Sequence, residues 1–192
     1  MVKIKLNQFF KIIKPLTEYA FVEWDERWIH NMRKMVLSLL VDNTSGVLSR
    51  VSGMFSRRGY NIDSLSVGVT ENPQYSRMTV AVSGDDRILS QIKKQLLKLE
   101  DVIAIKELKD GTSVCRELLL VKIKATLEER QQIISLTNVF RANVVDVSTD
   151  SVMIEITGNV NKIEAFISLL DGFEIEEMVR TGLTGLTRGT VE

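Results

Sequence analysis

The sequence predicts an α+β fold built from two tandem units, each with the element order βαββαβ. Apolar residues alternate in short strand-like runs, and between these runs they recur at helical spacing. The order of elements in the first half then returns in the second half, although the residues themselves do not repeat. Each unit is expected to form an antiparallel sheet with both helices on one face, which is the ferredoxin-like arrangement.

The first unit begins with an almost continuous apolar run at 35–41, which is typical of a buried strand. The turn DNTSG at 42–46 offers Asn, Thr and Ser side chains that can cap a helix. Apolar residues from Val47 to Phe55 then fall on one helical face, and Gly59 suits a left-handed helix end. The remaining elements are a strand at 64–69 with Leu65, Val67 and Val69 alternating, a strand at 76–84, a helix at 86–99 and a strand at 101–108.

The second unit follows a short linker at 110–113. Its expected elements are a strand at 117–125, a helix at 127–140, strands at 142–148 and 151–158, a helix at 160–170 and a strand at 173–182. We therefore expect an N-terminal extension at 1–31, a first domain at 32–109 and a second domain at 114–192.

Composition excludes several classes of protein. The 192 residues contain 25 Lys and Arg against 25 Asp and Glu, so no overall field attracts nucleic acid or membrane. No apolar run reaches the roughly 18 residues that a membrane span needs. A single cysteine, Cys115, excludes an internal disulfide framework and fits a reducing compartment, so a cytoplasmic location is expected.

The first 31 residues differ from the rest of the chain. They are Lys-rich and apolar at first, then acidic, and they hold Trp24, Trp28 and the only histidine, His30. They lack the unbroken apolar region of a secretory signal, and their composition fits a plastid or mitochondrial transit peptide only weakly. We interpret them as an extension outside the functional unit.

A catalytic constellation is missing from the sequence. It has no Walker loop, no GxGxxG after a strand and no metal-ligand spacing. With one histidine a His-dependent triad is disfavoured, and Cys115 fits a buried or strand-end thiol better than a nucleophile. The carboxylates mostly alternate with apolar residues or lie on helix faces, as on a solvated surface. We predict no catalytic and no metal-binding residue.

One pair of loops has the chemistry of an α-amino acid site. In the loop before the first helix, Gly46 lets a ligand approach the backbone, and the helix N–H groups favour a carboxylate. The next crossover, 59–63, could place the side-chain oxygen of Asn61 beside the same helix, where it would accept an ammonium group. The residues alone leave open a capped helix and a tight turn without any ligand.

Several long motifs follow one another from Met32 onward. They are LLVDNTSGVLSRVSGMFSRRGYNIDSLSVG (39–68), SRMTVAVSGDD (76–86), QIKKQLLKLEDV (91–102), RELLLVKIKA (116–125), FRANVVDVS (140–148) and RTGLTGLTRG (180–189). With these motifs the first unit resembles an ACT domain, and the chain from Met32 onward resembles the small subunits of acetolactate (acetohydroxyacid) synthase. Residues 1–31 have no counterpart in the bacterial form of the family.

The resemblance implies a non-catalytic regulatory subunit in branched-chain amino acid biosynthesis. It implies a large catalytic subunit that carries thiamine diphosphate, FAD and magnesium, with no cofactor on this chain. It further implies that the small subunit activates this partner and confers feedback inhibition by valine bound between the ACT domains of a homodimer. The positions that match the family's effector site are Asn43, Gly46, Asn61 and Ile62. The expected compartment is the bacterial cytosol, with the plastid as the alternative.

Three other functions are weighed against this one. An RNA-binding module with the same element order would need aromatic residues on its central strands, and the strand at 76–84 has none. An ACT-type sensor that controls another enzyme or a transcription factor is the main alternative. A stand-alone enzyme is disfavoured by the missing constellation.

Overall fold

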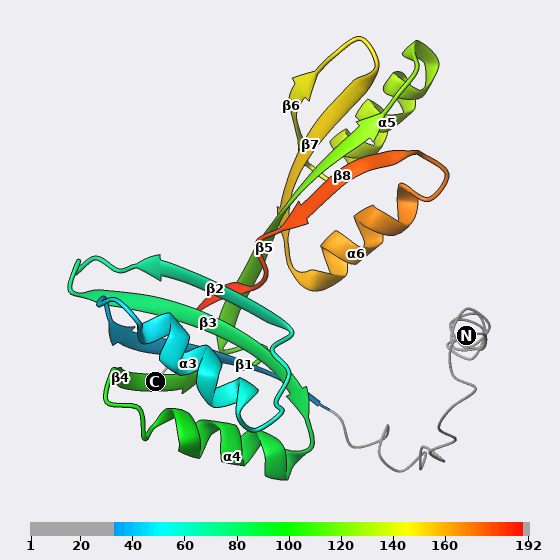
Figure 1. The fold of residues 1–192 in the computed structure, drawn as a ribbon. Coiled ribbons are helices and arrows are strands. Elements are labelled where there is room, and N and C mark those ends of the chain that lie inside the picture. Colours follow the sequence, from blue (N-terminus) through cyan, green and yellow to red (C-terminus); the bar gives the residue numbers. More distant parts are fainter. Residues whose placement is uncertain (1–32, 190–192) are drawn as a thin grey trace. The chain divides into compact units, whose positions relative to one another are not determined.

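The computed structural model describes residues 33–189, and these form two antiparallel sheets with four helices (Figure 1). The extension at 1–31, with Trp24, Trp28 and His30, lies outside the described residues. The N-terminal module comprises β1 Arg33–Asp42, α3 Val47–Ser56, β2 Ser64–Val69, β3 Tyr75–Gly84, α4 Asp86–Leu96 and β4 Val102–Glu107. The C-terminal module comprises β5 Ser113–Lys124, α5 Leu127–Val139, β6 Asn143–Val147, β7 Ser151–Gly158, α6 Val160–Leu169, β8 Ile175–Arg180 and β9 Thr184–Thr187.

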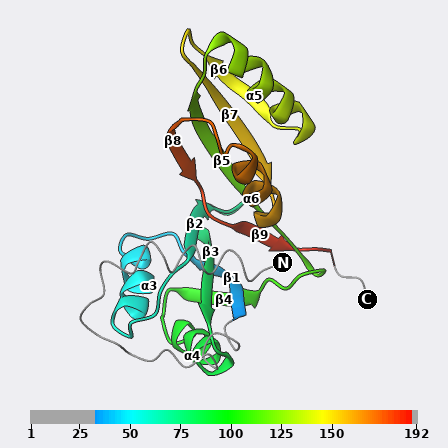
Figure 2. The same ribbon diagram turned by 90° about the vertical axis from the view of Figure 1, so that its right-hand side faces the viewer.

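The N-terminal module has the predicted ferredoxin-like topology. Its strands lie in the order β2-β3-β1-β4, all antiparallel, so β2 and β4 form the two edges. Alternate residues of β1 and β3 are buried against α3 and α4, which lie on one face of the sheet (Figure 2). The core includes Leu37, Val80, Phe55 and Leu89, each at most 1% exposed. Burial of this alternating face is what fixes the register of the central strands.

The C-terminal module repeats the arrangement, with strand order β6-β7-β5-β8 and with α5 and α6 packed on one face. Its core includes Val121, Ile154 and Phe166. The ring of Phe166 meets that of Phe140 edge-on at 5.3 Å between centroids. Thr126 and Glu129 form a reciprocal capping box at the start of α5. The α+β fold with two tandem ferredoxin-like units is therefore confirmed.

The end of the chain adds a strand that the sequence pattern did not predict. β5 begins at Ser113, four residues before the expected strand at 117–125, because its first residues pair with β9. Gly185 allows this pairing, because a Cβ there would stand 2.7 Å from the sulfur of Cys115. Cys115 is half-buried in β5, as expected for a strand-end thiol.

The alternation in β2 predicts a strand correctly but not its burial. Leu65 packs against the core, whereas Val67 and Val69 are 47% and 70% exposed. Both valines lie on the helix-bearing face, paired with Met78 and Ser76, but at the open edge of the sheet. An edge strand with exposed apolar residues is a ready template for pairing with another strand.

Candidate effector site

The first predicted loop is held in place by the Asn43 side chain. Its Nδ2 donates to the carbonyl of Pro73 at 2.8 Å, and its Oδ1 accepts from Ser76 Oγ at 3.0 Å. The Asn43 backbone N–H also donates to the carbonyl of Gln74. Both ends of the amide are thus engaged with the β2–β3 hairpin, so Asn43 sets the path of the loop.

Gly46 begins helix α3 in the left-handed conformation, with φ of 87°. The expected side-chain cap from Asn, Thr or Ser is wrong, because Gly46 itself is the N-cap residue and no side chain accepts from the first turn. By contrast, Asp85, Thr126 and Asn159 cap the other three described helices. The first-turn N–H groups of α3 therefore remain available to an anion, whose charge the helix dipole favours.

An arginine that the sequence pattern did not single out stands beside this helix start. Arg50 donates to the Asp101 carboxylate from Nε at 2.5 Å and from Nη2 at 2.6 Å. These hydrogen bonds lower the pKa of Asp101 and raise the pKa of Arg50. The third nitrogen, Nη1, faces Gly46, since it lies 2.9 Å from where a Cβ on that residue would stand. The pair connects the start of α3 to the residue before β4.

The second predicted loop presents an amide oxygen. Asn61 is exposed, and its Nδ2 donates to the Asp63 carboxylate at 3.3 Å, while its Oδ1 accepts no hydrogen bond from residues 33–189. Ile62 is half-buried and packs against the core, so its side chain anchors the loop. Gly59 has a φ of 66°, which confirms the predicted left-handed helix end.

Within one chain the two loops do not meet. They lie at opposite ends of α3, whose ten residues span about 15 Å. The strand register agrees, because Asp42, just before the first loop, pairs with Tyr75, whereas Ser64, just after the second loop, pairs with Ala81. Asn61 follows the C-terminal end of α3, which is the end remote from Gly46.

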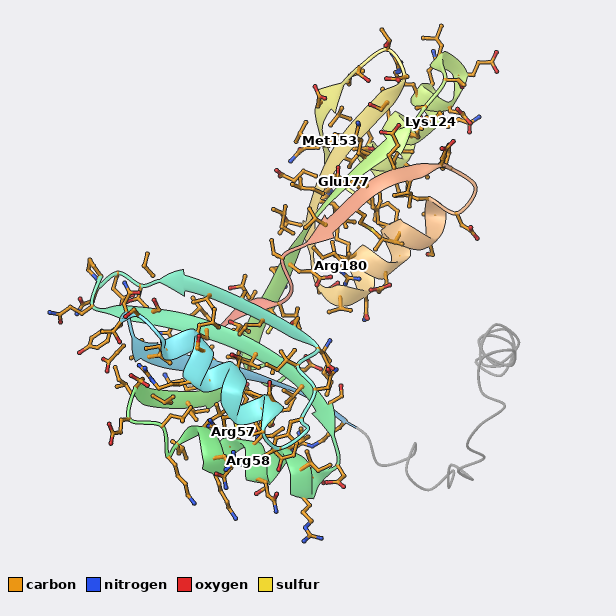
Figure 3. All side chains as sticks on the ribbon, in the orientation of Figure 1. Arg57, Arg58, Lys124, Met153, Glu177 and Arg180 are labelled. Atoms are coloured by element: carbon orange, nitrogen blue, oxygen red, sulfur yellow. The ribbon has the colours of Figure 1, made fainter. Side chains whose placement is uncertain are left out.

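Other polar features of the described chain lie apart from these loops. Two cavities of about 420 and 740 Å³ are lined by none of Asn43, Gly46, Asn61 and Ile62, although the smaller one is lined by Val67 and Val69 of β2. Arg180, labelled in Figure 3, binds the buried carboxylate of Glu117 and reaches Glu164 at 2.6 Å, which ties β8 to β5 and α6. Among residues 33–189 no group of His, Cys, Asp and Glu is placed to hold a metal ion. None of the helices in this part is long and apolar enough to cross a membrane.

Comparison with known proteins assigns both halves of the chain. Residues 37–104 match the ACT domain of the AHAS small subunit, and residues 116–189 match the small subunit of acetolactate synthase. A probable acetolactate synthase small subunit of Methanothermobacter thermautotrophicus is 49% identical over 156 residues, which cover 81% of this chain and 93% of that protein. The acetolactate synthase small subunit of Mycobacterium bovis is 51% identical over 153 residues, which cover 80% and 91%.

A solved structure gives the same result. The crystal structure of the acetolactate synthase small subunit from Thermotoga maritima superposes with a TM-score of 0.77 at 40% identity, covering 83% of this chain and 99% of that one. The fold and these matches define a two-module protein of the ACT class. Within that class, the chain belongs to the family of acetolactate synthase small subunits.

Proposed function

We propose that this chain is the regulatory subunit of an acetolactate synthase and binds a branched-chain amino acid, in the first instance valine, at the loops around Gly46 and Asn61. Family membership supports the assignment to this enzyme. The observation that carries the site is the start of α3, where a left-handed glycine replaces a side-chain cap. Exposed helix N–H groups with no competing side chain suit a carboxylate.

The second half of the site comes from a second copy of the chain. Because the two loops lie at opposite ends of β2, a single copy can offer an amino acid only one of them. An antiparallel pairing of β2 with the β2 of another copy sets the Val69 end of one strand beside the Ser64 end of the other. The carboxylate then binds the start of α3 in one copy, and the ammonium group binds Asn61 Oδ1 of the other copy.

The exposed edge of β2 supports this dimer. The pairing would continue one sheet through two copies, cover an unpaired row of backbone groups, and bury Val67 and Val69 beside the effector. A two-fold axis across the strand makes the contact isologous, so two equivalent sites form in each dimer. The side chain of valine would lie against these apolar residues of the edge.

In this proposal the chain couples effector binding to the activity of a catalytic partner. The partner carries thiamine diphosphate, FAD and magnesium and makes acetolactate, and this chain raises its activity. Bound valine favours an arrangement of the two modules that holds the partner in a less active state. A coupling free energy of about 1–3 kcal/mol is typical of such systems.

Reconstitution with the catalytic subunit tests the proposal. Acetolactate formation is measured with the catalytic subunit alone, with this chain added, and with both plus valine. We expect no activity from this chain alone, a rise on mixing, and a fall when valine is added. If mixing leaves the rate unchanged while valine still binds this chain, the chain senses amino acids for a different partner.

A further inference from the structure

A three-residue segment, Thr181–Leu183, connects β8 to β9 and is hydrogen-bonded at both ends. At its first residue, the Thr181 backbone N–H donates to the carbonyl of Leu118 at 3.1 Å, and Thr181 Oγ1 accepts from the Leu118 N–H at 3.1 Å. Leu118 lies in β5, the central strand that pairs with both β7 and β8. The start of the segment is therefore fixed to the C-terminal module.

The last residue of the segment is fixed to the N-terminal module. Ser66 Oγ donates to the carbonyl of Leu183 at 2.8 Å, and the Leu183 N–H donates to Ser64 Oγ at 3.3 Å. Both backbone groups of Leu183 thus bind side chains of β2. Leu183 is 4% exposed, and the helix-free face of this sheet also holds Ala81, which is fully buried.

Gly182, between these two anchors, permits the close contact. Its φ is 76°, a conformation that side chains rarely adopt, and a Cβ there would stand 2.9 Å from the Cβ of Ser64. The small side chains of β2 and the absence of one at Gly182 allow two backbones to approach. Nothing larger than glycine fits without pushing β2 and the segment apart.

β2 is also the strand nearest the proposed effector. It begins at Ser64, directly after the loop that carries Asn61 and Ile62, and it forms the edge at which the second copy is expected to pair. The Asp63 N–H donates to the carbonyl of Ala81 at 2.9 Å, so the end of this loop is already held to the sheet. A shift of β2 on effector binding is therefore passed to Ser64 and Ser66 directly.

We infer that Thr181–Leu183 transmits effector occupancy from β2 to the C-terminal module; the inference rests on the proposed function. Effector binding at the edge of β2 moves the two serine hydroxyls, which carry the backbone of Leu183 with them. Thr181 passes the displacement to Leu118 and so to the middle of the second sheet. The segment lies within RTGLTGLTRG (180–189).

The test separates effector binding from coupling with the double variant Ser64→Ala/Ser66→Ala. Calorimetry gives the valine Kd for the full-length variant alone and in the presence of the catalytic subunit. Because coupling between two ligands is reciprocal, the catalytic subunit should change the valine Kd of the wild-type chain, by about 5- to 150-fold for typical coupling. The ratio of the valine Kd with the catalytic subunit to the valine Kd without it should lie within about twofold of one in the double variant. The valine Kd of the variant alone should stay within about threefold of the wild-type value.

Two further variants complete the design. Ser90→Ala/Ser135→Ala removes two exposed helix hydroxyls elsewhere and should leave the ratio at its wild-type value. Gly182→Ala changes the segment instead of β2. Its added methyl group should separate Gly182 from Ser64, bring the ratio of the two valine Kd values close to one, and leave both cores intact. This variant also serves if the double serine variant folds poorly.

Each outcome has a distinct meaning. If Ser64→Ala/Ser66→Ala and Gly182→Ala both keep the wild-type ratio of valine Kd values, the inference is overturned. It is also overturned if the serine variant no longer binds valine by itself, since the hydroxyls would then belong to the site. If the wild-type chain binds neither valine nor the catalytic subunit, the proposed function fails first.

Discussion

Arg50 Nη1 lies 2.9 Å from the position that a Cβ on Gly46 would occupy, so a side chain at this position would displace the end of the Arg50 side chain. The same arginine is held by both oxygens of Asp101. The loop therefore combines a left-handed glycine, uncapped helix N–H groups and a fixed cation within one turn of helix. These three features make Gly46 the most informative position to change.

Gly46→Asp should remove inhibition by valine and leave activation of the catalytic subunit largely intact. The new carboxylate can cap the helix N–H groups and would repel the incoming carboxylate. Loss of a charge-assisted contact predicts valine binding at least about 30-fold weaker, or about 2 kcal/mol. The left-handed backbone adds a cost in stability of about 1–2 kcal/mol. Valine titration of the reconstituted enzyme measures the first effect, and urea unfolding the second.

Gly111→Asp is the matched control. Gly111 also has a positive φ, of 84°, but no atom lies within 4 Å of its added Cβ. It should carry a similar strain and keep full inhibition by valine. Unchanged inhibition in the Gly46 variant would show that the effector does not bind at this loop.

Asn61 and Asn43 should differ in what they contribute. Asn61→Ala removes an exposed oxygen and is expected to weaken valine binding with little change in thermal stability. Asn43→Ala breaks hydrogen bonds to Pro73 and Ser76, so both valine binding and stability should fall, the latter by about 1–3 kcal/mol. Calorimetry measures valine binding by the two variants, and thermal unfolding measures their stability. If the ligand contacted Asn43 and not Asn61, Asn61→Ala would bind valine as the wild-type chain does.

The edge of β2 should govern the oligomeric state. Val69→Asp places a charge at an apolar edge that we expect to pair with a second copy, so it should give a monomer at tens of micromolar and lose valine binding with it. Val139→Asp, at an equally exposed position on α5, should stay dimeric. Sedimentation velocity distinguishes them. A wild-type monomer with and without valine would contradict the shared site.

The Arg50–Asp101 pair should make the protein sensitive to acid. The hydrogen bond from Arg50 lowers the pKa of Asp101 in the folded state, so the pair contributes stability above the ordinary carboxyl pKa of about 4. That contribution is lost as pH falls through the lowered folded value. The difference in urea midpoint between wild type and Asp101→Asn should therefore be largest near pH 6 and shrink toward pH 3. A constant difference would show that the charge of Asp101 does not matter.

Sequence patterns predicted most of the fold, because burying one face of a strand or helix makes apolar residues recur at the repeat of that element. Eleven of the twelve expected elements lie within three residues of those observed, and the strand at 117–125 begins four residues early. That early start depends on the pairing with β9, whose residues lie about 70 positions further along the chain. No local pattern encodes such a contact.

The site was predicted less completely, for reasons that are geometric. Asn43, Gly46 and Asn61 lie in the loops that the sequence indicated, but the sequence could not show that both ends of the Asn43 amide are used within the chain. It also could not show that Gly46 takes a positive φ in place of a side-chain cap. The distance between the loops follows from the length of α3, and that distance is what calls for a second copy.

Calorimetry of the pure protein with valine, leucine and isoleucine tests the central claim most directly, because it needs no catalytic partner. We predict saturable heat for valine, with one molecule bound per chain since each dimer holds two equivalent sites, and weaker heat for Gly46→Asp. Heat from none of the three amino acids, at a protein concentration where the chain is dimeric, would contradict the account.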